Sequence, residues 1–286
     1  MPGTCGVWKT TDVTDADLGL VVGGYNADGA QKVETSRQPN NLWTVTATFP
    51  PCGSDADTTL VRTMALSDTT THLAVAQSSI GMDCAADCTS RAAAIAASNA
   101  KVVGRYYRWP TSKYKSLTHA EAAALSKAGL SILSLWEWAS DAIENFSFND
   151  GVDQGTSAVN QALKAHQPPG TPIYFAVDFD ASSSDVSGRI ADYFKGVQHA
   201  IDSLKAGYVV GVYGSGRTCA WLLAHGGASR TWLADARKWA GYDTFTEWHV
   251  RQGHNDLNIA GLKPGAKGDY DSDEVKANAG FFSGVV

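Results

Sequence analysis

The residues most able to do chemistry are acids that stand at the ends of apolar runs. The run PIYFAVDFD, residues 172–180, ends in Asp178 and Asp180, and two other runs end near Asp83 and Glu137. Glycosidic bond cleavage requires a pair of carboxyl groups with unequal pKa values. If the runs are neighbouring strands, these acids share one cleft, and their crowding there raises at least one pKa. We therefore take these four residues as candidate catalytic groups.

Aromatic and polar residues near the same run ends are candidates for holding a substrate. Sugar rings stack on aromatic faces, although each aromatic residue is equally suited to filling the core of the protein. Arg105 shares the strand parity of Tyr107 and is placed to hydrogen-bond an acid or an acyl group. The predicted substrate-binding set is Arg105, Tyr107, Trp109, Trp138, Tyr213, Asp235, Gln252 and Asp271.

Other chemistries fit the sequence less well. YGSGR, residues 213–217, is not a nucleophile elbow because Tyr213 and Arg217 stand where that motif needs glycine. No Lys-Ser or Lys-Thr pair follows it, so it is not a P-loop. The seven histidines show no metal-ligand spacing. We therefore expect neither a metal nor a cofactor.

The five cysteines are too few for a disulfide scaffold. They are read equally well as free thiols or as local bridges such as Cys84 to Cys88.

The elements that would position the acids form a repeated pattern of strand and helix. Short apolar runs alternate with alanine-rich amphipathic segments, one of which has Thr118 as N-cap and Gly129 as C-cap. Eight such units predict a TIM-like (β/α)8 barrel of parallel strands, whose C-terminal ends carry the site. The rival fold is an open doubly wound sheet, but the sequence lacks the dinucleotide-binding glycine fingerprint that would support it. The predicted strands are 79–84, 101–108, 131–138, 172–180, 209–215, 231–237, 247–252 and 268–273.

The first part of the chain has a different pattern. Threonine-rich apolar runs such as LGLVVGGYN, LWTVTATF, LVRTMALS and THLAVAQ are separated by Gly, Asn, Asp and Pro, which is typical of antiparallel strands. We predict a small β-rich module or barrel cap over residues 1–77, followed by the barrel over 78–286. The module is read as a cover for the barrel, as a wall-binding unit, or as the contact for a delivery partner.

Composition and charge limit the classes of binding partner that the chain can have. The chain has 286 residues, 44% of them apolar, and a net charge of -6. Acidic and basic residues are interspersed and the net charge is negative, whereas binding to nucleic acid or to an anionic membrane surface would favour a basic face. No apolar stretch is long enough to span a membrane, and MPGTCGVWKTTD lacks the features of a secretory signal. We expect the site of action to be extracellular, at the cell wall or in the periplasm, and the route of export is not visible in the sequence.

Several segments together resemble a known family. GMDCAADCTSRAAAIAASNAKVVGRYYRW, LTHAEAAALSKAGLSILSLWEW, PPGTPIYFAVDFD and YVVGVYGS, in that order, resemble the glycoside-hydrolase-like domain family called domain of unknown function 1906, itself similar to the family 25 lysozymes. The resemblance implies a TIM-like barrel that acts on peptidoglycan or a related glycan. Asp83 and Asp178 match the acids that those lysozymes carry on strands one and four. Asp180 stands where they have Glu, so Glu137 is the alternative general acid.

These observations predict a lysozyme-like glycoside hydrolase of the cell wall. Glu137 or Asp180 would be the general acid, and Asp178 the nucleophile, base or electrostatic stabiliser, while Asp83 and Asp235 would position the substrate or tune the pair. Two alternatives stay open. One is a glycan-binding protein on a barrel that has lost catalysis, and the other is an enzyme for a different polysaccharide.

Overall fold

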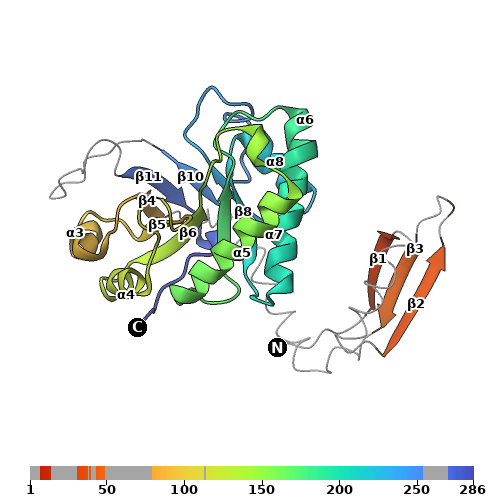
Figure 1. The fold of residues 1–286 in the computed structure, drawn as a ribbon, viewed down its shortest axis with the longest axis horizontal. Coiled ribbons are helices and arrows are strands. Elements are labelled where there is room, and N and C mark those ends of the chain that lie inside the picture. Colours follow the sequence, from red (N-terminus) through yellow and green to blue (C-terminus); the bar gives the residue numbers. More distant parts are fainter. Residues whose placement is uncertain are drawn as a thin grey trace, which may run out of the picture. The chain divides into compact units, whose positions relative to one another are not determined.

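The computed structural model describes residues 7–13, 31–37, 39, 43–48, 79–112, 114–253 and 270–286 (Figure 1). The chain separates into two compact units, Met1–Val75 and Ala76–Val286. Each unit has its own sheet.

The N-terminal unit contains a three-stranded antiparallel sheet in the order β1-β3-β2. Its strands are β1 (Val7–Val13), β2 (Lys32–Arg37) and β3 (Trp43–Thr48). The β-rich character predicted for this region is confirmed, and LWTVTATF supplies β3. The other runs expected to be strands here, LGLVVGGYN, LVRTMALS and THLAVAQ, lie outside the described residues.

Eight strands of the second unit close into a barrel in the order β10-β11-β4-β5-β6-β7-β8-β9 (Figure 1). All eight predicted strands exist, and the TIM-like fold class is confirmed. The strands are β4 (Ser79–Asp83), β5 (Val102–Tyr107), β6 (Ser131–Trp136), β7 (Pro172–Ala176), β8 (Val209–Gly214), β9 (Arg230–Leu233), β10 (Val250–Gln252) and β11 (Asp271–Val275).

One strand departs from the expected all-parallel arrangement. β11 pairs antiparallel with both β10 and β4, whereas the other neighbouring pairs of the barrel are parallel. An apolar run does not reveal the direction of its strand, which is why the sequence pattern missed this. As a consequence, the N-terminal end of β11 lies at the barrel end where the other strands terminate, and Asp271 pairs with Asp83.

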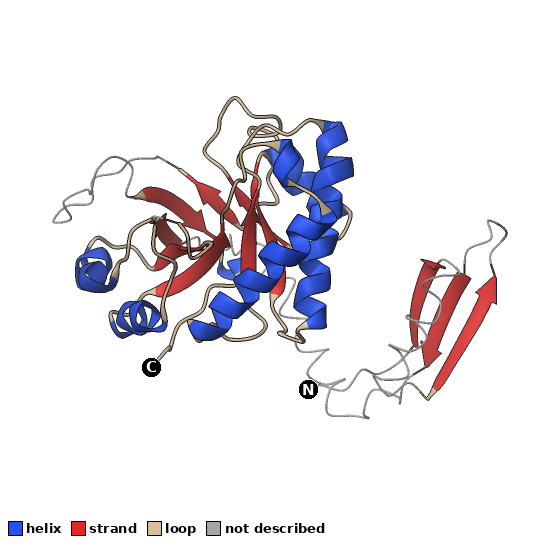
Figure 2. Cartoon of the chain, viewed as in Figure 1, coloured by secondary structure: helices blue, strands red, loops and turns tan. Residues whose placement is uncertain are grey.

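In the described part of the chain, α-helices follow five of the barrel strands, β4 to β8, and pack on the outside of the barrel (Figure 2). Thr118 caps α4 (His119–Lys127) by accepting a hydrogen bond of 3.2 Å from the Glu121 amide, so the predicted N-cap is confirmed. The C-cap residue is Ala128, and Gly129, the predicted C-cap, follows it with a φ of 79°. Residues 234–249, between β9 and β10, hold turns instead of the expected helix. The helical elements are η1 (Thr89–Arg91), α3 (Ala92–Ala97), α4 (His119–Lys127), η2 (Ile143–Asn145), α5 (Phe148–Lys164), α6 (Ser183–Asp185), η3 (Val186–Ile190), α7 (Ala191–Ser203), α8 (Gly216–Ala224) and η4 (Ala277–Ala279).

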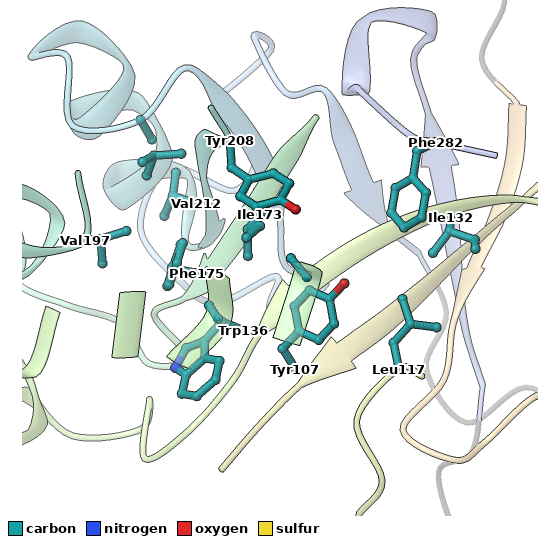
Figure 3. Close-up of a cluster of buried hydrophobic side chains, with 14 of the residues drawn as sticks. Tyr107, Leu117, Ile132, Trp136, Ile173, Phe175, Val197, Tyr208, Val212 and Phe282 are labelled. Atoms are coloured by element: carbon teal, nitrogen blue, oxygen red, sulfur yellow. The ribbon is translucent and has the colours of Figure 1, made fainter. Parts of the chain in front are cut away.

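Two apolar layers hold this unit together. The outer layer lies between strands and helices and includes Tyr107, Trp136 and Phe175 (Figure 3). The inner layer fills the barrel and includes Tyr106 and Trp232. The barrel strands therefore bury side chains on both faces.

Gly104 shows how tightly the barrel interior is filled. A Cβ atom at this position would lie 2.6 Å from the Trp232 ring and 2.7 Å from the Cβ atom of Asp83. Only glycine therefore fits between these two side chains, which explains the first residue of GRYYR.

Candidate active site

Four predicted acids gather at one end of the barrel. Asp83 is the last residue of β4, while Glu137 and Asp178 follow the ends of β6 and β7. Asp271 begins β11, which runs in the opposite direction and so delivers its first residue to the same end. The barrel topology thus brings acids from four strands to one mouth, as in other barrels of this class.

Asp83 is the buried centre of a group of hydrogen-bonded side chains. It is 2% exposed, and its two carboxylate oxygens accept hydrogen bonds from the Tyr106 hydroxyl at 2.5 Å and from Gln252 Nε2 at 3.1 Å. Gln252 Nε2 is also 3.1 Å from Asp271 Oδ2. Burial, followed by the negative charge of Asp271, raises the pKa of Asp83 to about 7, although both hydrogen bonds favour the carboxylate.

Glu137 and Asp178 line a pocket of about 520 Å³, which we call the acid pocket. Burial raises the pKa of both carboxyl groups. Arg108 opposes the shift at Glu137, whereas Asp141 adds to the shift at Asp178. The loop after β6 forms one wall, and the full lining is Arg108, Thr111, Ser112, Tyr114, Glu137, Trp138, Ala139, Ser140, Asp141 and Asp178.

Tyr213 connects the two groups of acids. Its hydroxyl donates a hydrogen bond of 3.0 Å to Gln252 Oε1. Desolvation, followed by the negative charges of Asp178, Asp83, Glu137 and Asp271, raises the pKa of this phenol well above its usual value. The four carboxylates therefore all lie near enough to this phenol to disfavour its ionised form.

Arg108 is a central residue that the sequence reading missed. Its Nη2 atom donates a hydrogen bond to Glu137 Oε2, and its guanidinium lies 4.6 Å from the ring centre of Tyr106 and 5.0 Å from that of Tyr114. The side chains of Ser116 and Gln161 hydrogen-bond its backbone. Arg108 stands two residues after Tyr106, so strand parity was the signal that would have indicated it.

Arg105 and Tyr107 do not belong to the mouth, and the prediction that they bind substrate from it is wrong. The Arg105 side chain is fully buried and binds Glu121 of α4 through Nε at 2.6 Å and through Nη2 at 3.2 Å. The Tyr107 hydroxyl donates to Gln167 at 2.9 Å in the outer layer. Both residues point toward the helices because alternate residues of a strand face opposite sides, and Tyr106 takes the inner side.

Asp180 also differs from expectation. It is exposed, and it accepts a hydrogen bond of 3.0 Å from the Ala240 amide instead of joining Asp178 in the acid pocket. The alternation that would place both acids on one side ends with β7 at Ala176. The expectation that Asp178 and Asp180 face the same side is therefore wrong.

The remaining predicted residues lie around the mouth. Trp138 lines the acid pocket, while Trp109 lines the groove beside it and packs edge-on against Trp136 with ring centres 5.4 Å apart. Asp235 accepts a hydrogen bond of 3.1 Å from the Tyr242 hydroxyl, and its amide donates to Gln252 Oε1 at 3.2 Å.

The part of the chain that the structure describes contains no cluster of three or more His, Cys, Asp or Glu side chains suited to a metal ion. In the same residues, no helix is both long and apolar enough to cross a membrane. Cys84, Cys88 and Cys219 are buried free thiols, whereas Cys5 and Cys52 lie outside the described residues.

A closed barrel whose mouth gathers carboxylates with raised pKa values has the architecture of a glycoside-hydrolase-like domain. The chain belongs to the family described as Rv2525c-like, glycoside hydrolase-like domain, whose model matches residues 93–275. The family membership predicted from the sequence is thereby confirmed.

Two known proteins are similar in sequence to part of this chain. Uncharacterized protein YbfG of Bacillus subtilis (strain 168) is 30% identical over 129 residues, which are 42% of this chain and 18% of that protein. Uncharacterized protein FadG of the same organism is 28% identical over 134 residues, or 46% of this chain and 23% of that protein. The matched part is therefore less than a quarter of these curated relatives.

A solved structure shows the same fold. The Tat-secreted protein Rv2525c of Mycobacterium tuberculosis, crystallised in complex with L-tartrate, superposes with a TM-score of 0.60 at 23% identity. The match covers 71% of this chain and 98% of that one.

Proposed function

We propose that this domain is a lysozyme-like glycoside hydrolase that cleaves peptidoglycan or a related cell-wall glycan. The observation that carries the proposal is the acid pocket, where Glu137 and Asp178 stand together with pKa values raised by burial. A carboxyl group that keeps its proton near neutral pH, beside one that loses it, is what general acid/base cleavage of a glycosidic bond uses.

The two carboxyl groups differ in their neighbours. Arg108 donates to Glu137 and favours its charged form, whereas Asp178 is accompanied by the negative charge of Asp141. We therefore assign proton donation to Asp178 and the charged role of base or nucleophile to Glu137. This reverses the roles expected from the sequence. Asp83, hydrogen-bonded at both oxygens, serves as a positioning residue.

The remaining parts of the mouth would hold the glycan. Trp138 contributes an aromatic surface to the acid pocket, and Asp235, Tyr213, Gln252 and Asp271 supply polar groups beside it. The proposed substrate lies outside the cytoplasmic membrane, so we place the site of action at the cell wall. The relative Rv2525c is a Tat-secreted protein, which agrees with this location.

The second candidate function is glycan binding without cleavage. It is favoured by the position of Asp180, because the strand-four acid that stands in place of the lysozyme Glu is exposed and bonded to the Ala240 amide outside the acid pocket. In this case the mouth would retain a polysaccharide and release no product.

Digestion of purified peptidoglycan, with mass spectrometry of the soluble products, distinguishes the two functions. The hydrolase should release fragments with new reducing ends. Asp178→Asn and Glu137→Gln should each lower the rate about 100-fold or more. Asp180→Asn is the matched control and should leave the rate within about twofold, since Asn can still accept the hydrogen bond from Ala240. Binding without products would select the second function, and unchanged rates in both pocket variants would refute the catalytic assignments.

A further inference from the structure

The helical segment that follows β7 is irregular at one point. α6 ends at Asp185 and α7 begins at Ala191, and η3 (Val186–Ile190) between them is a π-helical turn. Gly188 lies within this turn and departs from the helical backbone, with a φ of -105° and a ψ of -107°. A π turn inserts one residue into a helix and so redirects the side chains beside it, and such turns are frequent at functional sites.

The π turn carries Arg189, whose side chain reaches the loop after β6. Its Nε atom donates a hydrogen bond of 2.9 Å to the backbone oxygen of Phe146, and its Nη2 atom donates one of 2.9 Å to that of Glu144. Both oxygens lie at the C-terminal end of η2. The last carbonyl groups of a helix have no partner within it, and a basic side chain is well suited to bind them. Arg189 therefore holds the end of a short helix that belongs to another segment.

The loop that Arg189 holds is also a wall of the acid pocket. Arg189 itself is exposed and, among the described residues, is not part of the pocket lining. The lining residues of this loop end at Asp141, three positions before Glu144. Arg189 can therefore affect the pocket only through the loop. The lining residues that the loop supplies are Glu137, Trp138, Ala139, Ser140 and Asp141.

The same loop contacts the segment of Asp178 at two points. The Asp178 amide donates a hydrogen bond of 2.7 Å to the backbone oxygen of Ser140. Phe179, the next residue, packs against Phe146 with ring centres 5.9 Å apart. The Phe146 ring is buried and also meets Tyr193 of α7 edge-on at 5.0 Å. A displacement of the loop would thus be passed to Asp178 through both its backbone and its neighbouring ring.

We infer that Arg189 is a positioning residue of the active site, which fixes the loop after β6 and, through that loop, the place of Asp178 beside Glu137. The π turn directs Arg189 toward the loop, so Gly188 and Arg189 act as one unit. The inference rests on the proposed function, in which Asp178 is the proton donor. Catalysis depends steeply on such placement, because a displacement of about 1 Å can lower a rate about 100-fold.

Two single variants and their combination test this unit in the full chain, with soluble peptidoglycan fragments as substrate. Arg189→Met removes both donors. Gly188→Ala favours a regular helix, and in the described part of the chain its Cβ atom would meet nothing within 4 Å. We expect each change to lower kcat about tenfold and to leave KM within about twofold, since the placement of Asp178 is lost and the rest of the pocket remains.

The combined variant separates a shared cause from two independent ones. If both changes break the same contact, the double variant should also be slowed only about tenfold, whereas independent effects would multiply to about 100-fold. Arg189→Lys keeps a cationic donor and should recover part of kcat. Lys195→Met is the matched control, because Lys195 is an exposed cation of α7 that pairs with Asp192 at 3.0 Å. It should leave kcat unchanged.

Hydrogen exchange followed by mass spectrometry gives a readout that needs no turnover. Amides of residues 139–147 should exchange faster in Arg189→Met and in Gly188→Ala, while those of the barrel strands keep the wild-type rate. Unchanged exchange in the loop, a kcat within about twofold of the wild type, or multiplying effects would overturn the inference. A wild-type chain that releases no product would refute hydrolysis, and faster exchange in the variants would then still support the hold of Arg189 on the loop, so the two failures are distinguishable.

Discussion

The hydroxyl group of Tyr106 donates a hydrogen bond of 2.5 Å to Asp83, and the ring of the same residue lies under the guanidinium of Arg108. Arg108 in turn is paired with Glu137. One side chain of β5 therefore positions an acid on β4 with its hydroxyl and supports the partner of an acid beyond β6 with its ring. This explains how groups on separate strands are held in a common arrangement.

Tyr106→Phe separates these two contributions. It keeps the ring under Arg108 and removes the hydrogen bond to Asp83, which favours the charged form of that acid. We expect the pKa of Asp83 to rise further, and the free energy of unfolding to fall by about 1–3 kcal/mol because a buried acceptor loses a donor. Carbon-detected NMR titration and urea unfolding measure the two effects. An unchanged Asp83 titration would contradict the importance given to this bond.

Arg108→Met tests the positive charge that favours the ionised form of Glu137. Without the cation, the pKa of Glu137 should rise, because the ion pair now opposes the effect of burial. If ionised Glu137 is required, the acidic limb of the pH profile of kcat/KM should move to higher pH. Arg108→Lys keeps a positive charge and should give a smaller displacement. A profile that changes in height but not in position would assign Arg108 a purely structural role.

The stability of the domain should fall as the pH rises from about 4 to about 7. Asp83 has an ordinary pKa of 3.8, which the folded protein raises to about 7, so between these values the folded state binds more protons than the unfolded state. The buried Asp273 has a pKa raised well above its usual value, by burial first, and acts in the same direction. His249, whose pKa is lowered to about 4 by burial, acts in the opposite direction, so the fall in stability is the excess of the two acids over this histidine. Each such group contributes a slope of up to about 1.4 kcal/mol per pH unit.

Urea unfolding at a series of pH values measures this slope. Asp83→Asn removes one of the titrating groups and should flatten the dependence, even if the variant is less stable overall because its amide meets the donor group of Gln252. A slope equal to that of the wild type would show that Asp83 does not titrate in this range.

The sequence predicted the parts of the fold that depend on local pattern. Seven apolar runs and the weaker, polar run at 268–273 correctly located the eight barrel strands, and the acids at the strand ends correctly indicated Asp83, Glu137 and Asp178 as neighbours of one mouth. The direction in which side chains of β5 point was not readable, because every residue of this strand is buried and no polar alternation marks its two faces. The sequence therefore predicts Tyr107 at the mouth, where the structure has Tyr106.

The location of strand ends was the second limit. Asp178 and Asp180 follow β7 without a break in the sequence, yet the regular alternation stops at Ala176 and the two side chains separate. Such an end depends on contacts with other segments, here the Ala240 amide, which no local pattern encodes.

Arg105 forms a structural ion pair with Glu121 in place of the substrate contact that the sequence predicts, and this role can be tested. Arg105 and Glu121 are both fully buried, and Arg105 also donates to the backbone oxygen of Cys84, the residue after Asp83. Glu121→Gln leaves the guanidinium charge buried without its partner, so the free energy of unfolding should fall by about 3–5 kcal/mol. Glu247→Gln, at an exposed position, is the control and should change it by less than about 0.5 kcal/mol.

Affinity for the glycan distinguishes a structural role from a binding role. The folded fraction of Glu121→Gln should bind soluble peptidoglycan fragments with affinities within about twofold of the wild type, since neither Arg105 nor Glu121 lines the acid pocket or the pocket beside it. If the variant kept its stability but lost binding, Arg105 would have to reach the substrate after all, and the assignment of β5 side chains to the two faces of the barrel would be wrong.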